Sequence, residues 1–245
     1  MTKPFKLLSV IIPVYNEEST IAEVIEKVTA VELPVEKEII VVDDGSTDNT
    51  VGVLRAGSSH LIHTHVSPVN SGKGAAVRIG LGIAKGDVVI IQDADLELDP
   101  NEYGRLIGPI LSEKAKVVYG SRFLDSNKIP MSRRFANQVL TSITNILFGT
   151  RLTDMETAYK VFTREVVASL NLTATGFEIE PEITAQIALN GFAIREVPIS
   201  YRPRTVNEGK KIRWQDGLKA IRTLVRCRLE GQRSPSQAER RESKS

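Results

Sequence analysis

The segment Val88-Val89-Ile90-Ile91-Gln92-Asp93-Ala94-Asp95-Leu96-Glu97 joins an apolar run to two aspartates spaced one residue apart. A short apolar run of this kind is typical of a buried strand. Successive side chains of an extended chain point to opposite sides, so Asp93 and Asp95 are expected on one side and Ala94 on the other. Paired carboxylates at a strand end suit a hard divalent cation, which can hold a diphosphate and neutralise it as it leaves. The segment therefore predicts metal-assisted transfer from a nucleotide-activated donor.

Strands and helices are expected to alternate before this segment. Apolar runs predict strands, and apolar residues at helical spacing predict helices. The expected order is strand 7–13, helix 20–28, strand 38–42, a short helix after Asp48, an extended segment 60–65, helix 75–84 and strand 88–91. This alternation favours an α/β domain with a mostly parallel sheet flanked by helices. Ligands of such sheets collect at the carboxyl ends of the strands, where Asp43, Asp44, Asp93 and Asp95 fall.

The second half of the chain carries longer amphipathic helices. The expected elements are strands 116–120 and 194–200 and helices 132–148, 182–189 and 214–229. In helices 132–148 and 214–229, basic residues border an apolar stripe. Each stripe either faces the core, as in most amphipathic helices, or rests on a lipid surface. Residues 231–245 are polar and rich in Ser, Arg and Glu, which predicts a disordered tail.

Composition excludes several classes of protein. The 245 residues suffice for one sizeable core, and a formal net charge of +2 gives no global field that would attract nucleic acid. Basic residues crowd the region 202–228, a cluster that suits phosphates or an anionic membrane surface. The single cysteine, Cys227, excludes an intrachain disulfide and fits a reducing cytoplasm. No run reaches about 18 apolar residues, so we expect a cytoplasmic protein that contacts a membrane only peripherally.

Several motifs together resemble those of a known family. The segments 10–17, 42–48 and 92–95, which include Pro13-Val14-Tyr15-Asn16-Glu17 and Val42-Asp43-Asp44-Gly45-Ser46, are similar to the inverting family 2 glycosyltransferases of GT-A fold. The segments 120–122, 134–137, 154–160 and 196–201 resemble the polyprenyl (dolichyl) phosphate mannose and glucose synthases. The similarity covers roughly residues 7–215. It implies a GT-A fold and transfer of a hexose, with inversion, from GDP-mannose or UDP-glucose to a polyprenyl phosphate.

The resemblance also implies roles for individual residues. The positions that match donor-binding positions of the family are Pro13, Tyr15, Glu17, Val42, Asp44, Asp93, Ala94, Asp95, Arg204 and Lys210. Mg²⁺ or Mn²⁺ is expected on Asp93, Asp95 and Glu97, where Glu97 replaces the Gln that is common in the mannose synthases. Arg122 and Arg134 are expected to bind the acceptor phosphate or the departing diphosphate and form the catalytic set with Asp93 and Asp95.

The domain organisation follows from the same comparison. We expect one GT-A domain over residues 1–230, with a donor-nucleotide half over about 1–115 and an acceptor half over about 116–230. Because a polyprenyl acceptor lies in a bilayer, the enzyme is expected to visit the cytoplasmic face of a membrane through its amphipathic helices.

Other interpretations remain open for some of these residues. Asp43 and Asp44 are alternatively turn caps, and Asp43 fits that role better. The glycine-rich stretch 70–74 lacks the spacing of a phosphate-binding P-loop, so Lys73 is expected to be a minor donor contact or a helix start. A sugar or protein hydroxyl is a second candidate acceptor; it would require a general base, for which Glu97 or Asp154 are the candidates. A non-catalytic nucleotide-sugar-binding protein is a third interpretation, which the intact Asp93 and Asp95 pair disfavours.

Overall fold

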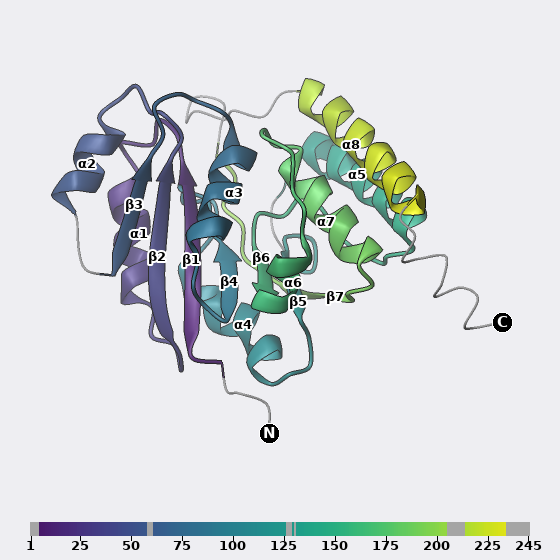
Figure 1. Ribbon diagram of the computed structural model, residues 1–245, viewed down its shortest axis with the longest axis horizontal. Coiled ribbons are helices and arrows are strands. Elements are labelled where there is room, and N and C mark those ends of the chain that lie inside the picture. The colour runs from purple at the N-terminus through teal and green to yellow at the C-terminus, as the bar shows by residue number, and fades with distance from the viewer. Residues whose placement is uncertain (1–4, 58–60, 126–128, 130, 205–213, 234–245) are drawn as a thin grey trace.

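The computed structural model describes residues 5–57, 61–125, 129, 131–204 and 214–233, and a seven-stranded sheet runs through its centre (Figure 1). The strands are β1 (Leu7–Val14), β2 (Glu36–Asp43), β3 (Ile62–Val66), β4 (Val88–Ile91), β5 (Val117–Ser121), β6 (Lys160–Thr163) and β7 (Ile194–Pro198). Their order across the sheet is β3-β2-β1-β4-β6-β5-β7. Only β6 is antiparallel to its neighbours, β4 and β5, so the expected mostly parallel sheet is confirmed.

Helices cover both faces of this sheet. They are α1 (Ile21–Ala30), α2 (Thr50–Ala56), α3 (Lys73–Ile83), α4 (Tyr103–Leu111), α5 (Met131–Phe148), α6 (Arg164–Ser169), α7 (Ile179–Leu189) and α8 (Trp214–Arg233), with a 3-10 turn, η1 (Pro100–Glu102). The side chains of β1 alternate between the two faces. Leu8, Val10 and Ile12 enter the core that contains residues of α1 and α4, whereas Ile11 enters the core beneath α3.

The expected helices are all present, with ends shifted by a few residues. Four described elements were not expected: β6, α4, α6 and the short turn η1. Glycines 104 and 108 and Pro109 weaken the helical signal of α4. The tail was expected to begin at residue 231, but α8 continues to Arg233; the rest of the tail lies outside the described residues. The division into donor and acceptor halves stays a prediction, although β4 and β6 join the two in one sheet.

Helices α5 and α8 lie side by side beyond α7 (Figure 1). The expected apolar stripes are split between two environments. On α8, Leu224 and Cys227 are buried, whereas Leu218, Val225 and Leu229 are exposed. On α5 the exposed apolar residues are Met131, Phe135, Val139 and Ile146, while Ile143 and Leu147 pack against the core. Within the described residues, no helix is long and apolar enough to cross a membrane.

The contact between α3 and β1 depends on a glycine. A Cβ on Gly80 would lie 2.4 Å from Cγ2 of Ile11, which is fully buried. Two positions of the same helix thus differ sharply in their tolerance of a side chain, because a Cβ on Gly82 would meet nothing within 4 Å. Gly80 therefore lets the helix approach the sheet closely.

We predict opposite effects of alanine at these two glycines. Gly80→Ala should lower the free energy of unfolding by about 1–2 kcal/mol, because overpacking costs about 1–3 kcal/mol and the gain in helix propensity offsets only about 0.5–1 kcal/mol. Gly82→Ala should raise it by about 0.5–1 kcal/mol. Urea denaturation of both variants measures the difference. Equal effects of the two substitutions would show that Ile11 moves aside without lowering the free energy of unfolding.

Candidate active site

A cavity of about 690 Å³ opens at the carboxyl ends of the parallel strands. Ten of the residues expected from the sequence line it: Pro13, Tyr15, Glu17, Asp44, Asp93, Ala94, Asp95, Glu97, Arg122 and Arg204. Val42 does not line the cavity, because its side chain is fully buried beside Ile40 and Ala76 in the core under α3. Arg134 is exposed outside the lining, with its guanidinium 5.9 Å from the ring centre of Phe123. Lys210 lies outside the described residues.

The two aspartates after β2 have different roles. Asp43 accepts hydrogen bonds from the backbone N–H groups of Gly45 and Ser46, at 3.1 and 3.0 Å, and so caps its own turn. Asp44 instead accepts from the N–H groups of Ser71 and Gly72, at 2.9 and 2.6 Å. Capping of a local turn is therefore the role of Asp43. Asp44 lines the cavity and fixes the glycine-rich loop to the end of β2.

That glycine-rich loop brings Lys73 into the cavity. Gly72 has a φ of +100°, and a Cβ there would lie 2.4 Å from the carbonyl oxygen of Thr175. Only glycine permits both the backbone conformation and the close approach. Lys73, the first residue of α3, then pairs with Asp93 at 2.7 Å and with Glu180 at 2.9 Å. The sequence suggested only a minor role for Lys73, because its two partners lie far away along the chain.

The acidic segment after β4 concentrates negative charge. Leu96 has a φ of +60°, which turns the chain so that the N–H of Glu97 donates to Asp95 at 3.1 Å. Burial, together with the charges of Asp93 and Glu97, raises the pKa of Asp95 to about 7. Among the described lining residues, eight acidic side chains face three basic ones. An anionic diphosphate would be repelled from this cavity unless a cation accompanied it.

Glu97 holds the segment that follows β7 over the cavity. Its carboxylate accepts hydrogen bonds from the Tyr201 hydroxyl at 3.0 Å and from the Arg204 N–H at 2.6 Å. Arg204 then pairs with Glu17 at 2.9 Å and donates from Nε to the carbonyl oxygen of Asp95 at 2.7 Å. These contacts tie the expected donor-binding residues of β1, β4 and the 201–204 segment into one wall.

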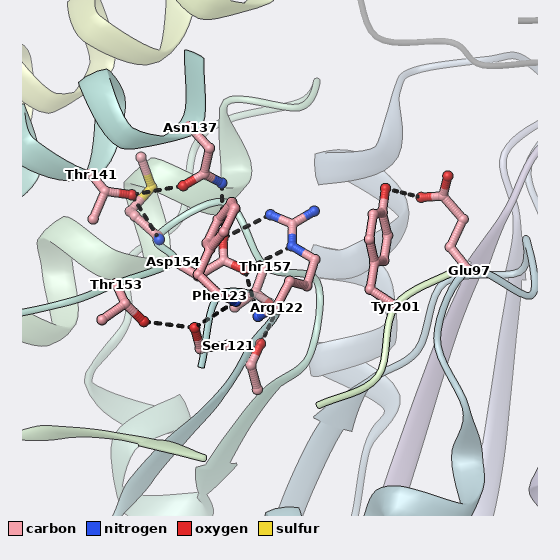
Figure 2. A network of polar contacts seen from close by, with 12 residues as sticks. Glu97, Ser121, Arg122, Phe123, Asn137, Thr141, Thr153, Asp154, Thr157 and Tyr201 are labelled. Carbon is pink, nitrogen blue, oxygen red and sulfur yellow. Dashed lines mark hydrogen bonds and ion pairs between the residues drawn. The ribbon is translucent and has the colours of Figure 1, made fainter. Parts of the chain in front are cut away.

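Arg122 is the centre of a second network, on the opposite side of Tyr201 (Figure 2). The Asp154 carboxylate is fully buried and receives the Arg122 Nε and Nη2 groups, both at 2.7 Å, and the Arg122 N–H at 3.0 Å. Asn137 of α5 donates a fourth bond to Asp154 at 2.8 Å. The Tyr201 ring lies 5.2 Å from the guanidinium carbon of Arg122. A bidentate ion pair and an aromatic face thus fix the orientation of Arg122.

The same network rules out one candidate general base. Burial would raise the pKa of Asp154, but the charge and hydrogen bonds of Arg122 hold it below its ordinary value. A carboxylate with four hydrogen bonds and no exposure cannot accept a proton from an acceptor hydroxyl. The suggestion of Asp154 as base is therefore wrong. Glu97 also has both oxygens engaged. The carboxylate that the sequence interpretation missed is Glu156, which lines the cavity two residues after Asp154.

Two carboxylates of the site fit a divalent metal. Asp93 and Asp95 supply hard oxygen ligands, which Mg²⁺ and Mn²⁺ prefer. Within the described chain, no group of three acidic, His or Cys side chains is arranged to hold a metal ion, because Glu97 is directed to Tyr201 and Arg204. Mg²⁺ typically takes one or two protein carboxylates and completes its shell with substrate phosphates and water. The donor set therefore fits a metal that binds together with a diphosphate.

Comparison with known proteins identifies the family. The model of "Glycosyl transferase family 2" matches residues 9–170. The chain belongs to glycosyl transferase family 2. This confirms the resemblance to family 2 that the sequence motifs indicated.

Two relatives illustrate the kinds of protein that this family 2 chain resembles. It is 29% identical over 224 residues to the low-salt glycan biosynthesis hexosyltransferase Agl6 of Haloferax volcanii, covering 89% of this chain and 53% of that protein. It is 28% identical over 220 residues to the polyprenol monophosphomannose synthase of Mycolicibacterium smegmatis, covering 85% and 82%. The chain thus spans only about half the length of Agl6.

Solved structures confirm the fold. Glucosyl-3-phosphoglycerate synthase from Mycobacterium tuberculosis, in complex with Mn²⁺, UDP and phosphoglyceric acid, superposes with a TM-score of 0.70. The match covers 94% of this chain and 80% of that one at 23% identity. The expected GT-A architecture is therefore confirmed.

The Arg122 and Asp154 pair should be important for stability. We predict that Asp154→Ala lowers the free energy of unfolding by about 3–5 kcal/mol, because it leaves a largely buried guanidinium without its partner. The matched control is Glu165→Ala, which removes a pair with Lys116 at the same 2.7 Å distance but with both side chains more than half exposed. It should cost less than about 1 kcal/mol. Denaturant titration of both variants measures these losses. Similar losses of the free energy of unfolding would contradict the importance of burial.

Proposed function

We propose that this protein moves a hexose, with inversion, from a nucleotide diphosphate sugar to a polyprenyl phosphate. The observation that carries the proposal is that the Asp93 and Asp95 pair and the fixed guanidinium of Arg122 line one cavity. The pair suits the diphosphate of a donor, and the guanidinium suits the phosphate of an acceptor. Membership of family 2 supports the reaction type, and the similarity to a polyprenol monophosphomannose synthase supports the acceptor.

The donor would lie along the wall built by β1, β2 and β4. Tyr15 and Glu17 follow β1, Asp44 follows β2, and all three line the cavity beside Arg204. The carboxylates that follow these strands offer hydrogen-bond acceptors to a base or ribose. The donor is GDP-mannose or UDP-glucose in this proposal.

Asp93 and Asp95 would hold Mg²⁺ or Mn²⁺. When bound, the metal supplies positive charge that neutralises the departing diphosphate. Lys73 already pairs with Asp93 at 2.7 Å, so the ammonium adds a second positive charge at the same carboxylate. Arg204, held by Glu17, adds a third on the opposite wall.

The acceptor needs orientation rather than a base. A phosphate monoester has a second pKa of about 6, so it is largely ionised near neutral pH. One phosphate oxygen attacks the anomeric carbon in line, opposite to the bond that breaks to the diphosphate, and the configuration inverts. Arg122 orients the phosphate, and its own orientation is fixed by Asp154. Arg134, whose guanidinium lies 5.9 Å from the ring centre of Phe123, would attract the lipid phosphate as it enters.

A soluble acceptor is the second candidate. The structural neighbour with a TM-score of 0.70 was solved with phosphoglyceric acid, a soluble molecule that also carries a phosphate. Arg122 would suit the phosphate of either kind of acceptor. The two candidates therefore differ in the acceptor and not in the donor.

A transfer assay tests the proposal. The protein is incubated with GDP-mannose or UDP-glucose, Mn²⁺ and a short-chain polyprenyl phosphate, and the glycolipid is measured. We expect transfer that EDTA abolishes.

The Asp95→Ala variant should lose transfer activity but keep the thermal stability of the wild type, because the substitution removes repulsion among carboxylates. Arg122→Lys should reduce turnover more than about tenfold, since Lys lacks the bidentate fork. Full turnover in EDTA would refute the metal dependence of transfer. Transfer only to phosphoglycerate would favour the soluble acceptor.

The exposed apolar residues of α5 and α8 are proposed to rest on a membrane. Phe135 is 69% exposed, Ile146 is 83% exposed and Leu218 is 58% exposed. The exposed side of α8 also carries Lys219, Arg222 and Arg226, whose charges complement anionic lipids. Aromatic and aliphatic side chains bordered by basic ones are typical of interfacial helices.

We predict that the protein sediments with anionic vesicles and that salt weakens this binding. Each basic side chain near the surface contributes about 1 kcal/mol, and about 0.15 M salt screens charges beyond about 8 Å. The double substitution Phe135→Ser and Ile146→Ser should reduce the bound fraction. The matched control Val66→Ser changes an exposed apolar residue of the edge strand β3 and should not. A protein that stays in the supernatant at low salt would contradict the membrane surface.

A further inference from the structure

The buried Oε1 of Glu156 has no hydrogen-bond partner in the described structure. The other acidic residues that line the cavity each have a hydrogen bond or an ion pair: Glu17 and Glu97 with Arg204, Asp44 with the 71–72 backbone, Asp93 and Glu180 with Lys73, Asp95 with the Glu97 N–H and Asp216 with Lys219. By contrast, Oε1 of Glu156 is buried without a hydrogen bond. This carboxylate is therefore not used to hold the fold together.

The residues around Glu156 are firmly held. Asp154 is bonded to Arg122, and the Thr157 hydroxyl donates to the carbonyl oxygen of Gly120 at 2.5 Å. Lys160, the first residue of β6, is fully buried and pairs with Glu180 at 2.5 Å. The backbone on both sides of Glu156 is thus fixed where the residue lines the cavity.

An unpartnered carboxylate in such a place is unfavourable for folding. Burial, and next the charge of Glu180, raises the pKa of Glu156 to about 7, although Lys160 and Arg122 oppose this shift. A buried acceptor without a donor loses its hydration and gains nothing in exchange. Residues that lower stability and face a binding cavity are typical of functional sites, where activity and stability conflict.

The position of Glu156 relative to the reacting groups indicates its ligand. Two charged residues act on Glu156: Arg122, assigned to the acceptor phosphate, and Glu180, which shares Lys73 with Asp93 of the diphosphate site. In the proposed reaction the hexose lies between these two sites, because its anomeric carbon leaves one phosphate and joins the other. A hexose presents hydroxyl groups, which are the donors that a carboxylate lacks here.

We infer that Glu156 is a specificity-determining residue that accepts a hydrogen bond from a hydroxyl group of the hexose being transferred. The inference rests on the proposed function and extends it to the recognition of the sugar. A pocket built to bond a hydroxyl rejects sugars that lack it, because the carboxylate then stays unpaired. Glu156 thus selects among donors that share the same nucleotide.

The first measurement is thermal stability. Glu156→Gln and Glu156→Ala should melt at the same temperature as the wild type or above it, because each removes a carboxylate whose buried oxygen has no hydrogen bond. Glu165→Gln, an exposed and remote change, is the control for both stability and activity. A clear loss of stability in both Glu156 variants would show a structural role and overturn the inference.

The decisive measurement uses donors that lack one hydroxyl. Kinetics with the parent nucleotide hexose and its 2-, 3-, 4- and 6-deoxy analogues give the ratio of kcat/KM for each position. For one position, the wild type should prefer the parent by about tenfold to a hundredfold, and Glu156→Ala should bring this ratio close to one. The ratios at the other positions should persist. Binding of the bare nucleotide diphosphate with Mn²⁺ should not change, because it has no hexose. Unchanged ratios at every position would overturn the inference.

Two further outcomes separate the alternatives. If Glu156→Ala keeps its donor preference but loses transfer only to a hydroxyl-bearing soluble acceptor, Glu156 is a general base and not a sugar contact. If the wild type turns over no donor, the proposed function fails. In that case the ratio of dissociation constants for the parent and deoxy donors is measured by calorimetry, and a ratio that Glu156→Ala leaves unchanged contradicts the sugar contact.

Discussion

Burying a charge costs free energy unless an opposite charge or several hydrogen bonds accompany it, and this constraint arranges the whole cavity. Arg122 compensates Asp154, Arg204 compensates Glu17, and Lys73 and Lys160 share Glu180. The described basic groups of the cavity wall are thus already paired with acidic ones. Asp95 and Glu156 are the two lining carboxylates whose pKa rises to about 7, because burial outweighs the positive charges near them. A bound cation or hydrogen-bond donor would therefore stabilise these two carboxylates more than the others.

The sequence predicted the architecture well because the signals for it are local. Apolar runs mark the parallel strands, and polar residues directly after β1, β2, β4 and β5 mark the edge where the cavity opens. The prediction missed β6, because this strand has only four residues and begins with a lysine. That lysine is buried only because Glu180, twenty residues later, neutralises it. A partner at that distance leaves no mark in the local pattern.

The same limit explains the errors at the site. Family motifs pointed to ten lining residues but also to Val42, whose side chain faces the core on the other side of an alternating strand. The sequence pattern could not show that the Asp154 carboxylate accepts hydrogen bonds from Arg122 and Asn137. Without this information Asp154 was a candidate general base. Conversely, nothing in the spacing of Glu156 distinguishes it from a solvated acid. Its importance comes from the absence of a partner, which only the folded arrangement reveals among the described residues.

Helix α5 connects the outer surface to the reacting groups. Its outer side exposes Phe135 and Val139, while Asn137, between them in sequence, is buried and donates to Asp154 at 2.8 Å. Asp154 in turn orients Arg122 (Figure 2). One helix turn thus carries both the proposed membrane contact and the support of the proposed acceptor site. The Asn137 bond would be lost if α5 rotated by one residue. The register of α5 is therefore constrained on its buried side by the polar network and on its exposed side by the proposed membrane surface. A lipid phosphate that enters from that surface would meet Arg122 in an orientation already set by the fold.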